Sequence, residues 1–150
     1  MAGTYSKVYY HLVFSTKGRQ ESIITSIREE LYQYIGGIIR GEKGGVYAIG
    51  GTSNHIHILC SFPTKRSLSD MLQRIKGHSS LWIHKSFSDM RDFAWQAGYG
   101  VFSVSHSHLE TVRQYILTQE EHHKKMDFKD EFRLLLKKHE VTFNENYIWT

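Results

Sequence analysis

Residues 55–62 read HIHILCSF, and this stretch decides the fold. The side chains of a strand point alternately to its two faces. One face of this stretch is entirely apolar, with Ile56, Ile58, Cys60 and Phe62. The other face begins with His55 and His57, which lie two residues apart. We therefore expect a strand whose apolar face covers a hydrophobic core and whose two imidazoles point away from that core.

The flanking segments predict further strands and helices in alternation. Residues 5–15 and the short runs at 46–51 and 99–105 are rich in aromatic and β-branched residues, which favour strands. Over residues 22–40 apolar side chains recur every three or four positions, as on an amphipathic helix. Ser67, followed three residues later by Asp70, forms a capping box that opens a second helix, which ends near Phe87.

The last third of the chain predicts helices only. Ser107 with Glu110 forms a second capping box, which opens a helix that carries Tyr115, and residues 127–139 predict a final charged helix. All 12 glycines lie between residues 3 and 100, which agrees with a sheet region followed by helices. The resulting order is β-α-β-β-α-β. It predicts an α+β fold with a ferredoxin-like (split βαβ) antiparallel sheet, helices on one face and a C-terminal tyrosine-bearing helix, in one domain over 1–150.

Composition excludes several classes of protein. The single cysteine, Cys60, rules out a disulfide framework and a cysteine-rich zinc site. No apolar run reaches the roughly 18 residues that a membrane span needs, and the first residues lack the order of a signal peptide, so we expect a cytoplasmic protein without a membrane partner. The net charge is +4, from 19 Lys and Arg against 15 Asp and Glu, which is compatible with nucleic acid without deciding it.

The histidine pair is the first candidate for chemistry. Two imidazoles at this strand spacing can reach one metal ion. The alternative is that His55 and His57 are surface residues without a function. Residues 106–108 read HSH and repeat the spacing, but Ser107 predicts a helix start there, so the strand geometry does not apply.

The helix opened by Ser107 holds the second candidate. Tyr115, Gln119 and His122 follow one another at helical spacing on one face, and the amide oxygen of Gln119 suits a hard cation. The alternative is a half-buried packing tyrosine beside a solvated glutamine. The polar run at 121–125 is interpreted as a solvated helix end. Cys60 is disfavoured as a nucleophile, because it lies on the apolar strand face.

Basic residues precede and follow the start of the second predicted helix. They can be an ordinary solvated face or contacts to DNA phosphates. As DNA-binding candidates we take Lys65, Arg66, Arg74 and Lys76.

The histidine pair, followed by a helix with Tyr115 and Gln119, resembles a known combination. It is similar to the single-tyrosine HUH transposases of bacterial insertion sequences, the IS200-like transposases. The resemblance runs from about residue 5 to 135. Further blocks that resemble this family in order and spacing are 10–17 (YHLVFSTK), 75–80 (IKGHSS), 95–104 (WQAGYGVFSV) and 115–123 (YILTQEEHH).

The resemblance implies an activity and roles for the residues. Such enzymes cut one strand of single-stranded DNA that carries imperfect hairpins, and they rejoin it through a 5′-phosphotyrosine intermediate. On this basis Tyr115 is the nucleophile, while His55, His57 and Gln119 hold Mg²⁺ or Mn²⁺. The resemblance also implies a homodimer, in which the tyrosine helix can complete the partner's site, with residues 97–100 as a flexible connection.

Other functions remain open at this point. A protein of the same type can act on dispersed chromosomal repeat hairpins without moving itself. The fold also suits a nucleic-acid-binding module without enzyme activity, although histidines stand where such modules carry stacking aromatics. A metal-dependent phosphohydrolase would not need Tyr115. The DNA target, the choice between a tyrosine acting in cis or in trans, and the role of residues 141–150 are not predicted.

Overall fold

The strand with the two histidines, β3 (His55–Ser61), lies inside a four-stranded antiparallel sheet. The structure is a computed structural model, and it describes residues 3–150. The strand order is β2-β3-β1-β4. The other three strands are β1 (Tyr9–Ser15), β2 (Gly45–Gly51) and β4 (Gly100–Val104). With α1 (Thr25–Gly41) after β1 and α2 (Leu68–Ser86) after β3, this is the ferredoxin-like order that the sequence predicts.

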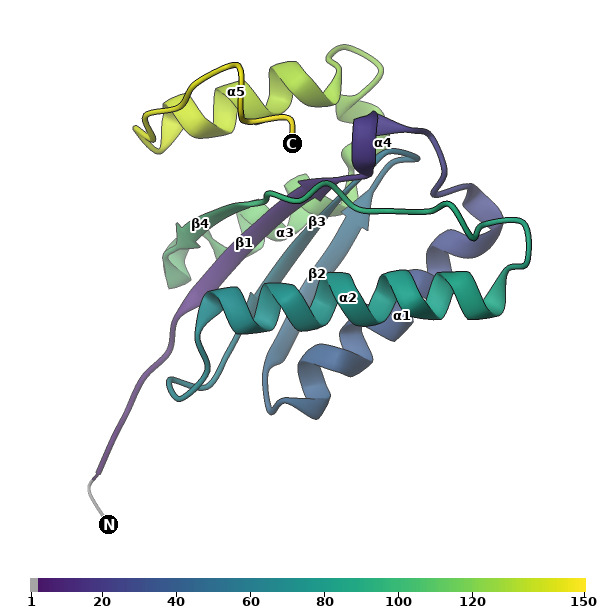
Figure 1. Cartoon of the computed structure of the whole chain (residues 1–150). Coiled ribbons are helices and arrows are strands. Elements are labelled where there is room, and N and C mark those ends of the chain that lie inside the picture. Colours follow the sequence, from purple (N-terminus) through teal and green to yellow (C-terminus); the bar gives the residue numbers. More distant parts are fainter. Residues whose placement is uncertain (1–2) are drawn as a thin grey trace.

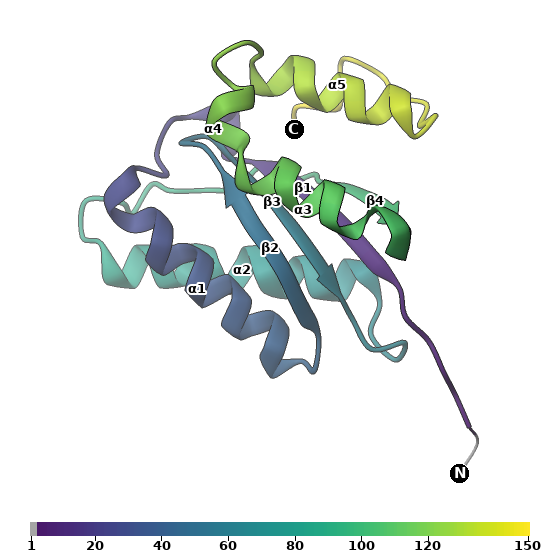
Figure 2. The ribbon, with the colours of Figure 1, turned by 180° about the vertical axis from the view of Figure 1, so that it is seen from behind.

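Helices cover both faces of the sheet (Figures 1 and 2). Helices α1 and α2 lie together on one face, and the main core fills the space between them and the sheet. That core contains Leu12 and Phe14 of β1 with Ile56 and Ile58 of β3, all fully buried. The apolar face that the sequence assigns to β3 is therefore confirmed.

The C-terminal helices lie on the opposite face of the sheet. They are α3 (Leu109–Leu117), the short α4 (Gln119–His122) and α5 (Phe128–Lys138). Ile116 of α3 packs against Leu59 of β3, while Phe132 of α5 packs against Val13 of β1. Residues 141–150, for which the sequence predicts no role, return along α5 and add Phe143, Ile148 and Trp149 to its apolar contacts. As a result, all seven residues of β3 are buried.

Two expected element starts are wrong. The first strand begins at Tyr9 and not at residue 5, because β3 and β4 end opposite Tyr9, at Ser61 and Val104, and leave residues 5–8 without a strand to pair with. The second capping box does not form. The side chain of Ser107 meets Ser105 and His108 in a short 3-10 turn, and the α-helix begins two residues later.

No helix within residues 3–150 combines the length and the apolar character that crossing a membrane requires.

Candidate functional site: a buried His-His-Glu cluster beside Tyr115

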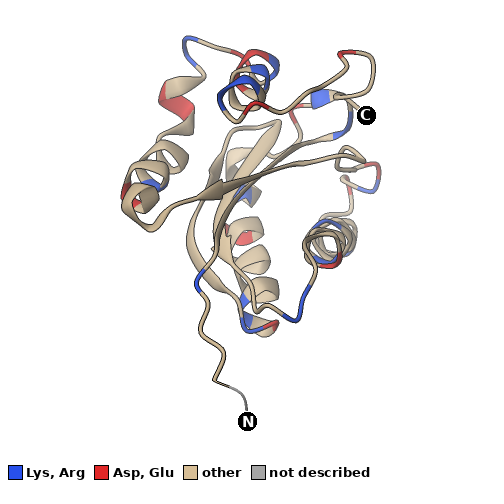
Figure 3. Ribbon diagram, turned by 90° about the vertical axis from the view of Figure 1, so that its left-hand side faces the viewer, with Lys and Arg blue, Asp and Glu red and all other residues tan. Residues whose placement is uncertain are grey.

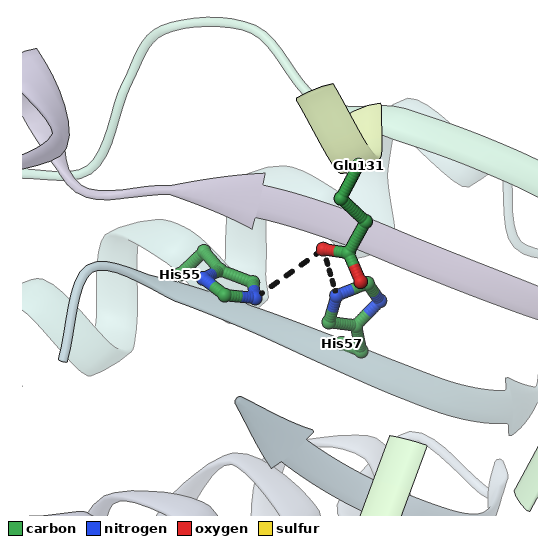
Figure 4. Close-up of side chains that lie close together, drawn as sticks. All are labelled: His55, His57 and Glu131. Carbon is green, nitrogen blue, oxygen red and sulfur yellow. Dashed lines mark hydrogen bonds and ion pairs between the residues drawn. The ribbon is translucent and has the colours of Figure 1, made fainter. Parts of the chain in front are cut away.

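The two histidines of β3 point toward one carboxylate. Nε2 of His57 lies 3.0 Å from Oε1 of Glu131, and Nε2 of His55 lies 3.4 Å from the same oxygen (Figure 4). Both imidazoles lie on the sheet face opposite the main core, as the alternation of residues 55–62 predicts. They are not surface residues, because α3, α4 and α5 cover this face and leave both rings fully buried.

Hydrogen bonds behind each ring fix its orientation. Nδ1 of His55 donates to Oδ1 of Asn54 at 2.8 Å. Nδ1 of His57 lies 2.8 Å from Nε2 of His11, a buried residue of the neighbouring strand β1. Burial, together with the nearby His57, lowers the pKa of His11 well below its ordinary value and keeps that ring neutral. Both site histidines therefore turn Nε2 toward Glu131, with Nδ1 held from behind.

Tyr115 and Gln119 reach the histidines from the last turn of α3 and the first residue of α4. Thr118 lies between the two helices with φ −111° and ψ 29°, so the single helix expected from Tyr115 to His122 is broken. The hydroxyl of Thr118 donates back to the carbonyl of Gln114 at 2.8 Å, which satisfies that end of α3. Oε1 of Gln119 lies 2.9 Å from Nε2 of His55. The structure therefore joins His55, His57, Tyr115 and Gln119 in one place.

The hydroxyl of Tyr115 donates a hydrogen bond to Oε2 of Glu131. Burial raises the pKa of this tyrosine above its ordinary value, and the negative charge of Glu131 raises it further. Burial also acts to raise the pKa of the Glu131 carboxyl, but His57, His123 and His55 outweigh it and leave that pKa below its ordinary range. Tyr115 is therefore held protonated against an ionised carboxylate.

Sequence reasoning misses three members of this site. Glu131 lies on the apolar face of α5, three residues after Phe128 and four before Leu135, and a lone acid among such residues is a usable signal. His123 belongs to the run that was interpreted as solvated, yet its Nε2 lies 3.1 Å from both Gln119 and Glu131. That interpretation is wrong for His123. His11 lies within β1, and nothing in the residues around it predicts that it contacts His57.

The donor atoms fit a divalent cation. Burial, with a smaller effect of His57, lowers the pKa of His55 to about 3, so this ring is neutral near pH 7. Because its Nδ1 hydrogen goes to Asn54, its Nε2 lone pair faces the oxygens of Gln119 and Glu131. Electron-pair donors that face one another in this way are stabilised by a cation between them. Imidazole nitrogen together with amide and carboxylate oxygen suits Mn²⁺ and Mg²⁺. The ligating atoms of His55, His57 and Glu131 all lie within 4.8 Å of one another.

A groove of about 880 Å³ leads to this cluster between α3, α5 and the end of β4. Tyr115 and Glu131 contribute to its wall, together with the rings of His11 and Phe102. The exposed residues Lys125 and Lys138 also line it. The groove therefore gives access to the tyrosine, while the histidines of β3 stay covered.

The four basic candidates of the α2 region lie apart from the cluster. Arg66 and Arg74 both pair with Glu42, at 2.5 and 3.1 Å. Lys76 donates to the carbonyls of Ala97 and Gly98 at 3.0 and 2.8 Å, and burial lowers its pKa to about 8. Lys65 is exposed. Lys and Arg are spread over several elements and do not gather in one stripe (Figure 3).

The comparisons with known proteins agree with this geometry. A family model described as "Transposase IS200 like" matches residues 4–119. The chain belongs to the IS200-like transposase family. The matched range includes His55, His57, Tyr115 and Gln119, and it ends before Glu131.

Individual relatives support the same assignment. The transposase for insertion sequence element IS200 of Salmonella typhimurium (strain LT2) is 28% identical over 121 residues, which are 77% of this chain and 78% of that protein. The ISDra2 transposase TnpA of Deinococcus radiodurans is 20% identical over 115 residues, which are 73% and 82% of the two chains.

Two solved structures share the fold of this IS200-like transposase. A crystal structure of a candidate transposase from Deinococcus radiodurans R1 matches with a TM-score of 0.65 and 20% identity, over 77% of this chain and 94% of that one. A REP-associated tyrosine transposase bound to a REP hairpin matches with a TM-score of 0.55 and 15% identity, over 77% of this chain and 70% of that one.

Proposed function

We propose that this IS200-like transposase nicks and rejoins single-stranded DNA that carries imperfect hairpins, with Tyr115 as the nucleophile. One observation carries the proposal. In a chain of this family, the hydroxyl of Tyr115 lies at the end of an accessible groove and beside a cluster of metal-ligating side chains. A nucleophile and a site for an electrophilic cation are the parts that cleavage of a phosphodiester needs.

The proposed reaction conserves bond energy. The phenol oxygen of Tyr115 bonds to the scissile phosphorus, and the bond from that phosphorus to the 3′-oxygen breaks. The products are a 5′-phosphotyrosine link and a free 3′-hydroxyl, to which the phenolic proton is transferred in net terms. Strand transfer is the reverse step with a second 3′-hydroxyl. Neither direction requires a nucleoside triphosphate.

The surroundings of Tyr115 explain why a cation is required. Burial and the charge of Glu131 raise its pKa, so the phenol loses its proton only where positive charge offsets that carboxylate. We assign His55, His57 and Gln119 as residues that hold a divalent ion, Mg²⁺ or Mn²⁺. When bound, this ion polarises the scissile phosphate and supplies the positive charge.

The groove beside Tyr115 suits a single strand. Phe102 and His139 stack there with ring centroids 4.6 Å apart, and Lys125 and Lys138 stand within reach of a phosphate backbone. Aromatic and basic side chains in one groove are typical of single-strand binding. The hairpin bound by the REP-associated structural neighbour supports a hairpin partner for this chain too.

We also propose that the protein is a homodimer. Its cytoplasmic location stays a prediction.

Covalent trapping tests the proposal. Wild-type protein with Mn²⁺ and a labelled single-stranded hairpin oligonucleotide should give a protein–DNA adduct that survives boiling in detergent, with the DNA attached through its 5′ phosphate. Tyr115→Phe should give no adduct and still bind the hairpin, because the ring is retained. Tyr5→Phe is a matched control, since Tyr5 is 95% exposed and far from the site in sequence.

The same assay separates the competing functions. A phosphohydrolase would cleave DNA equally well with Phe at position 115 and would form no adduct. A binding module would retain the hairpin without cleaving it. An adduct on another tyrosine, found by mass spectrometry, would contradict the role of Tyr115. Adduct formation on chromosomal repeat hairpins alone would favour a protein that no longer moves its own element.

A further inference from the structure

We propose that Glu131 is a resident ligand of the metal ion, and that its second oxygen holds the Tyr115 hydroxyl beside that ion. The inference rests on the proposed function, because it assumes a divalent ion at the histidine pair. It adds a residue from α5, and the family match at 4–119 does not extend to that helix. A single carboxylate would then couple the position of the nucleophile to the metal centre.

The first argument is the burial of an acid that has no permanent cationic partner. Glu131 is only 3% exposed. Among residues 3–150, every group within ion-pair distance of it is a histidine, namely His55, His57 and His123. His55 and His57 are themselves fully buried, so the carboxylate also has little access to solvent cations. A buried carboxylate is normally paired with a full positive charge or coordinated to a metal. A divalent ion supplies that charge here.

The second argument is the spacing of the donor atoms. Neighbouring ligands of an ion with bonds of about 2.1 Å in octahedral geometry lie about 3.0 Å apart. Oε1 of Glu131 lies 3.0 Å from Nε2 of His57 and 3.4 Å from Nε2 of His55, while Oε1 of Gln119 lies 2.9 Å from the latter. Glu131 therefore lies from both histidines at about the spacing that Gln119 has from His55.

The third argument is that the two oxygens of Glu131 face different partners. Oε1 faces the histidine pair, whereas Oε2 accepts the hydroxyl hydrogen of Tyr115. A carboxylate can use one oxygen for a metal and the other for a hydrogen bond, which orients the second group around the ion. Removal of Glu131 should thus change both the ion and the direction of the phenol oxygen.

The fourth argument is that α5 is fixed in place. Phe128 and Phe132, on either side of Glu131, are buried against Val13 and Phe102 of the sheet. Trp149 of the C-terminal segment also packs near Phe132. Asp127 also caps the helix by accepting from the main-chain N–H of Asp130 at 2.8 Å. These contacts hold the Glu131 carboxylate beside His55 and His57 when no DNA is bound.

Binding of Mn²⁺ alone, measured by electron paramagnetic resonance and calorimetry on the full chain, tests the proposal without any DNA. Glu131→Gln has the same shape and lacks the charge, and we expect it to bind Mn²⁺ at least about tenfold more weakly than the wild type. Asp130→Asn removes the same charge from the neighbouring, exposed residue and should bind as the wild type does. Glu131→Asp should recover part of the affinity.

A second readout covers the hydroxyl of Tyr115. With Mn²⁺ raised to saturate each variant, Glu131→Gln should show a lower kcat for adduct formation and an unchanged KM for the hairpin. Asp130→Asn should change neither constant. A Glu131→Gln protein with wild-type kcat under these conditions would refute the positioning role. Circular dichroism of the metal-free proteins checks folding. If Glu131→Gln is unfolded, the Mn²⁺ affinity and the kcat of Glu131→Asp test the proposal instead, and wild-type values of both would refute it.

The outcomes separate this inference from the proposed function. If the wild type binds no Mn²⁺, or if His57→Ala binds it equally well, the metal site itself is wrong. If His57→Ala loses binding while Glu131→Gln keeps full affinity, only the role of Glu131 as a ligand is wrong. Full affinity combined with faster nicking by Glu131→Gln would show that α5 blocks the site, which also overturns the proposal.

Discussion

Gly50 lies so close to the main-chain carbonyl of Ile116 that a Cβ atom at position 50 would stand 2.2 Å from the carbonyl oxygen. Gly50 is the residue of β2 that pairs with His57 of β3. The absence of a side chain lets α3 approach the sheet at the level of the histidine pair. Tyr115 precedes Ile116, and its ring centroid lies 5.7 Å from that of His57. The position of the proposed nucleophile therefore depends on a glycine of an edge strand.

We predict that Gly50→Ala displaces α3. The added methyl group meets backbone atoms, which cannot rotate away, so the protein should lose about 1–3 kcal/mol of stability. Adduct formation should fall further than hairpin binding, because Tyr115 moves relative to the histidines. Urea unfolding and covalent trapping measure the two effects.

Gly37→Ala is the matched control for this substitution. Gly37 is exposed on α1, and nothing lies within 4 Å of a Cβ built there. Alanine should therefore stabilise the helix by up to about 1 kcal/mol and leave adduct formation unchanged. A Gly50→Ala protein that behaves like this control would show that α3 does not depend on the close approach.

Local patterns were sufficient for the sheet and its first two helices. The alternation in residues 55–62 gave the correct face to every member of β3, because one buried face sets the register of a strand. The cap of α2 also forms as predicted, with the Ser67 hydroxyl accepting from the N–H of Asp70 at 3.1 Å. Both features depend on neighbours within a few residues.

Local patterns failed where neighbouring side chains compete for the same partner. Ser107 has the spacing of a cap, but its hydroxyl meets Ser105 and His108 instead of the helix N-terminus. The resemblance implied residues 97–100 as a flexible connection, and this stays a prediction. The segment leads into β4, which begins at Gly100, and the N–H of Gly98 donates to the carbonyl of Thr150 at 2.9 Å. Exchange of α3 through this segment would separate β4 from β1.

The centre of the site was beyond local patterns for a different reason. Glu131 meets His57, which is 74 residues away in the chain, only because the segment after His123 turns α5 back over the sheet. The direction of that turn has no signature in the sequence. The acid on the apolar face of α5 could have been noticed, but its partners could not have been named.

Removal of the metal ion or of its proposed ligands should lower activity, and the effect should differ between the amide ligand and the imidazole ligands. We predict that EDTA abolishes nicking. Gln119→Ala should lower activity and recover part of it at higher Mn²⁺, because a neutral amide oxygen contributes less than an imidazole. His57→Ala should be more severe and poorly rescued, since His55 alone would remain on the strand. A Mn²⁺ titration of the nicking rate measures both effects, and equal rescue of the two variants would contradict the assignment.

Two further experiments test the oligomeric state of the protein and whether Tyr115 acts in its own subunit or in the partner subunit. The order β2-β3-β1-β4 leaves two sheet edges for a second copy to cover, and we predict a particle of twice 17.6 kDa by light scattering. Within one chain Tyr115 already lies beside its own His57. A mixture of His57→Ala and Tyr115→Phe subunits should therefore stay inactive. Restored adduct formation in the mixture would show that the tyrosine acts in the partner subunit.

The last prediction concerns the basic residues near α2. Glu42 binds the guanidinium groups of both Arg66 and Arg74, and this pairing lowers the positive charge available to a phosphate backbone. If these arginines contact the hairpin, Glu42→Gln should release them and tighten hairpin binding severalfold at low salt. Each released cation that meets a phosphate also makes the dependence of binding on salt steeper.

Glu29→Gln is a suitable control for this change. Glu29 is exposed on α1, the helix that ends just before Glu42, and within residues 3–150 it accepts only from the amide of Gln33, at 3.4 Å. The control removes the same charge without freeing an arginine. Fluorescence anisotropy with a labelled hairpin at several salt concentrations compares the two variants. Equal affinities would mean that the DNA does not reach Arg66 and Arg74, so that the groove of Lys125 and Lys138 would have to hold the strand without them.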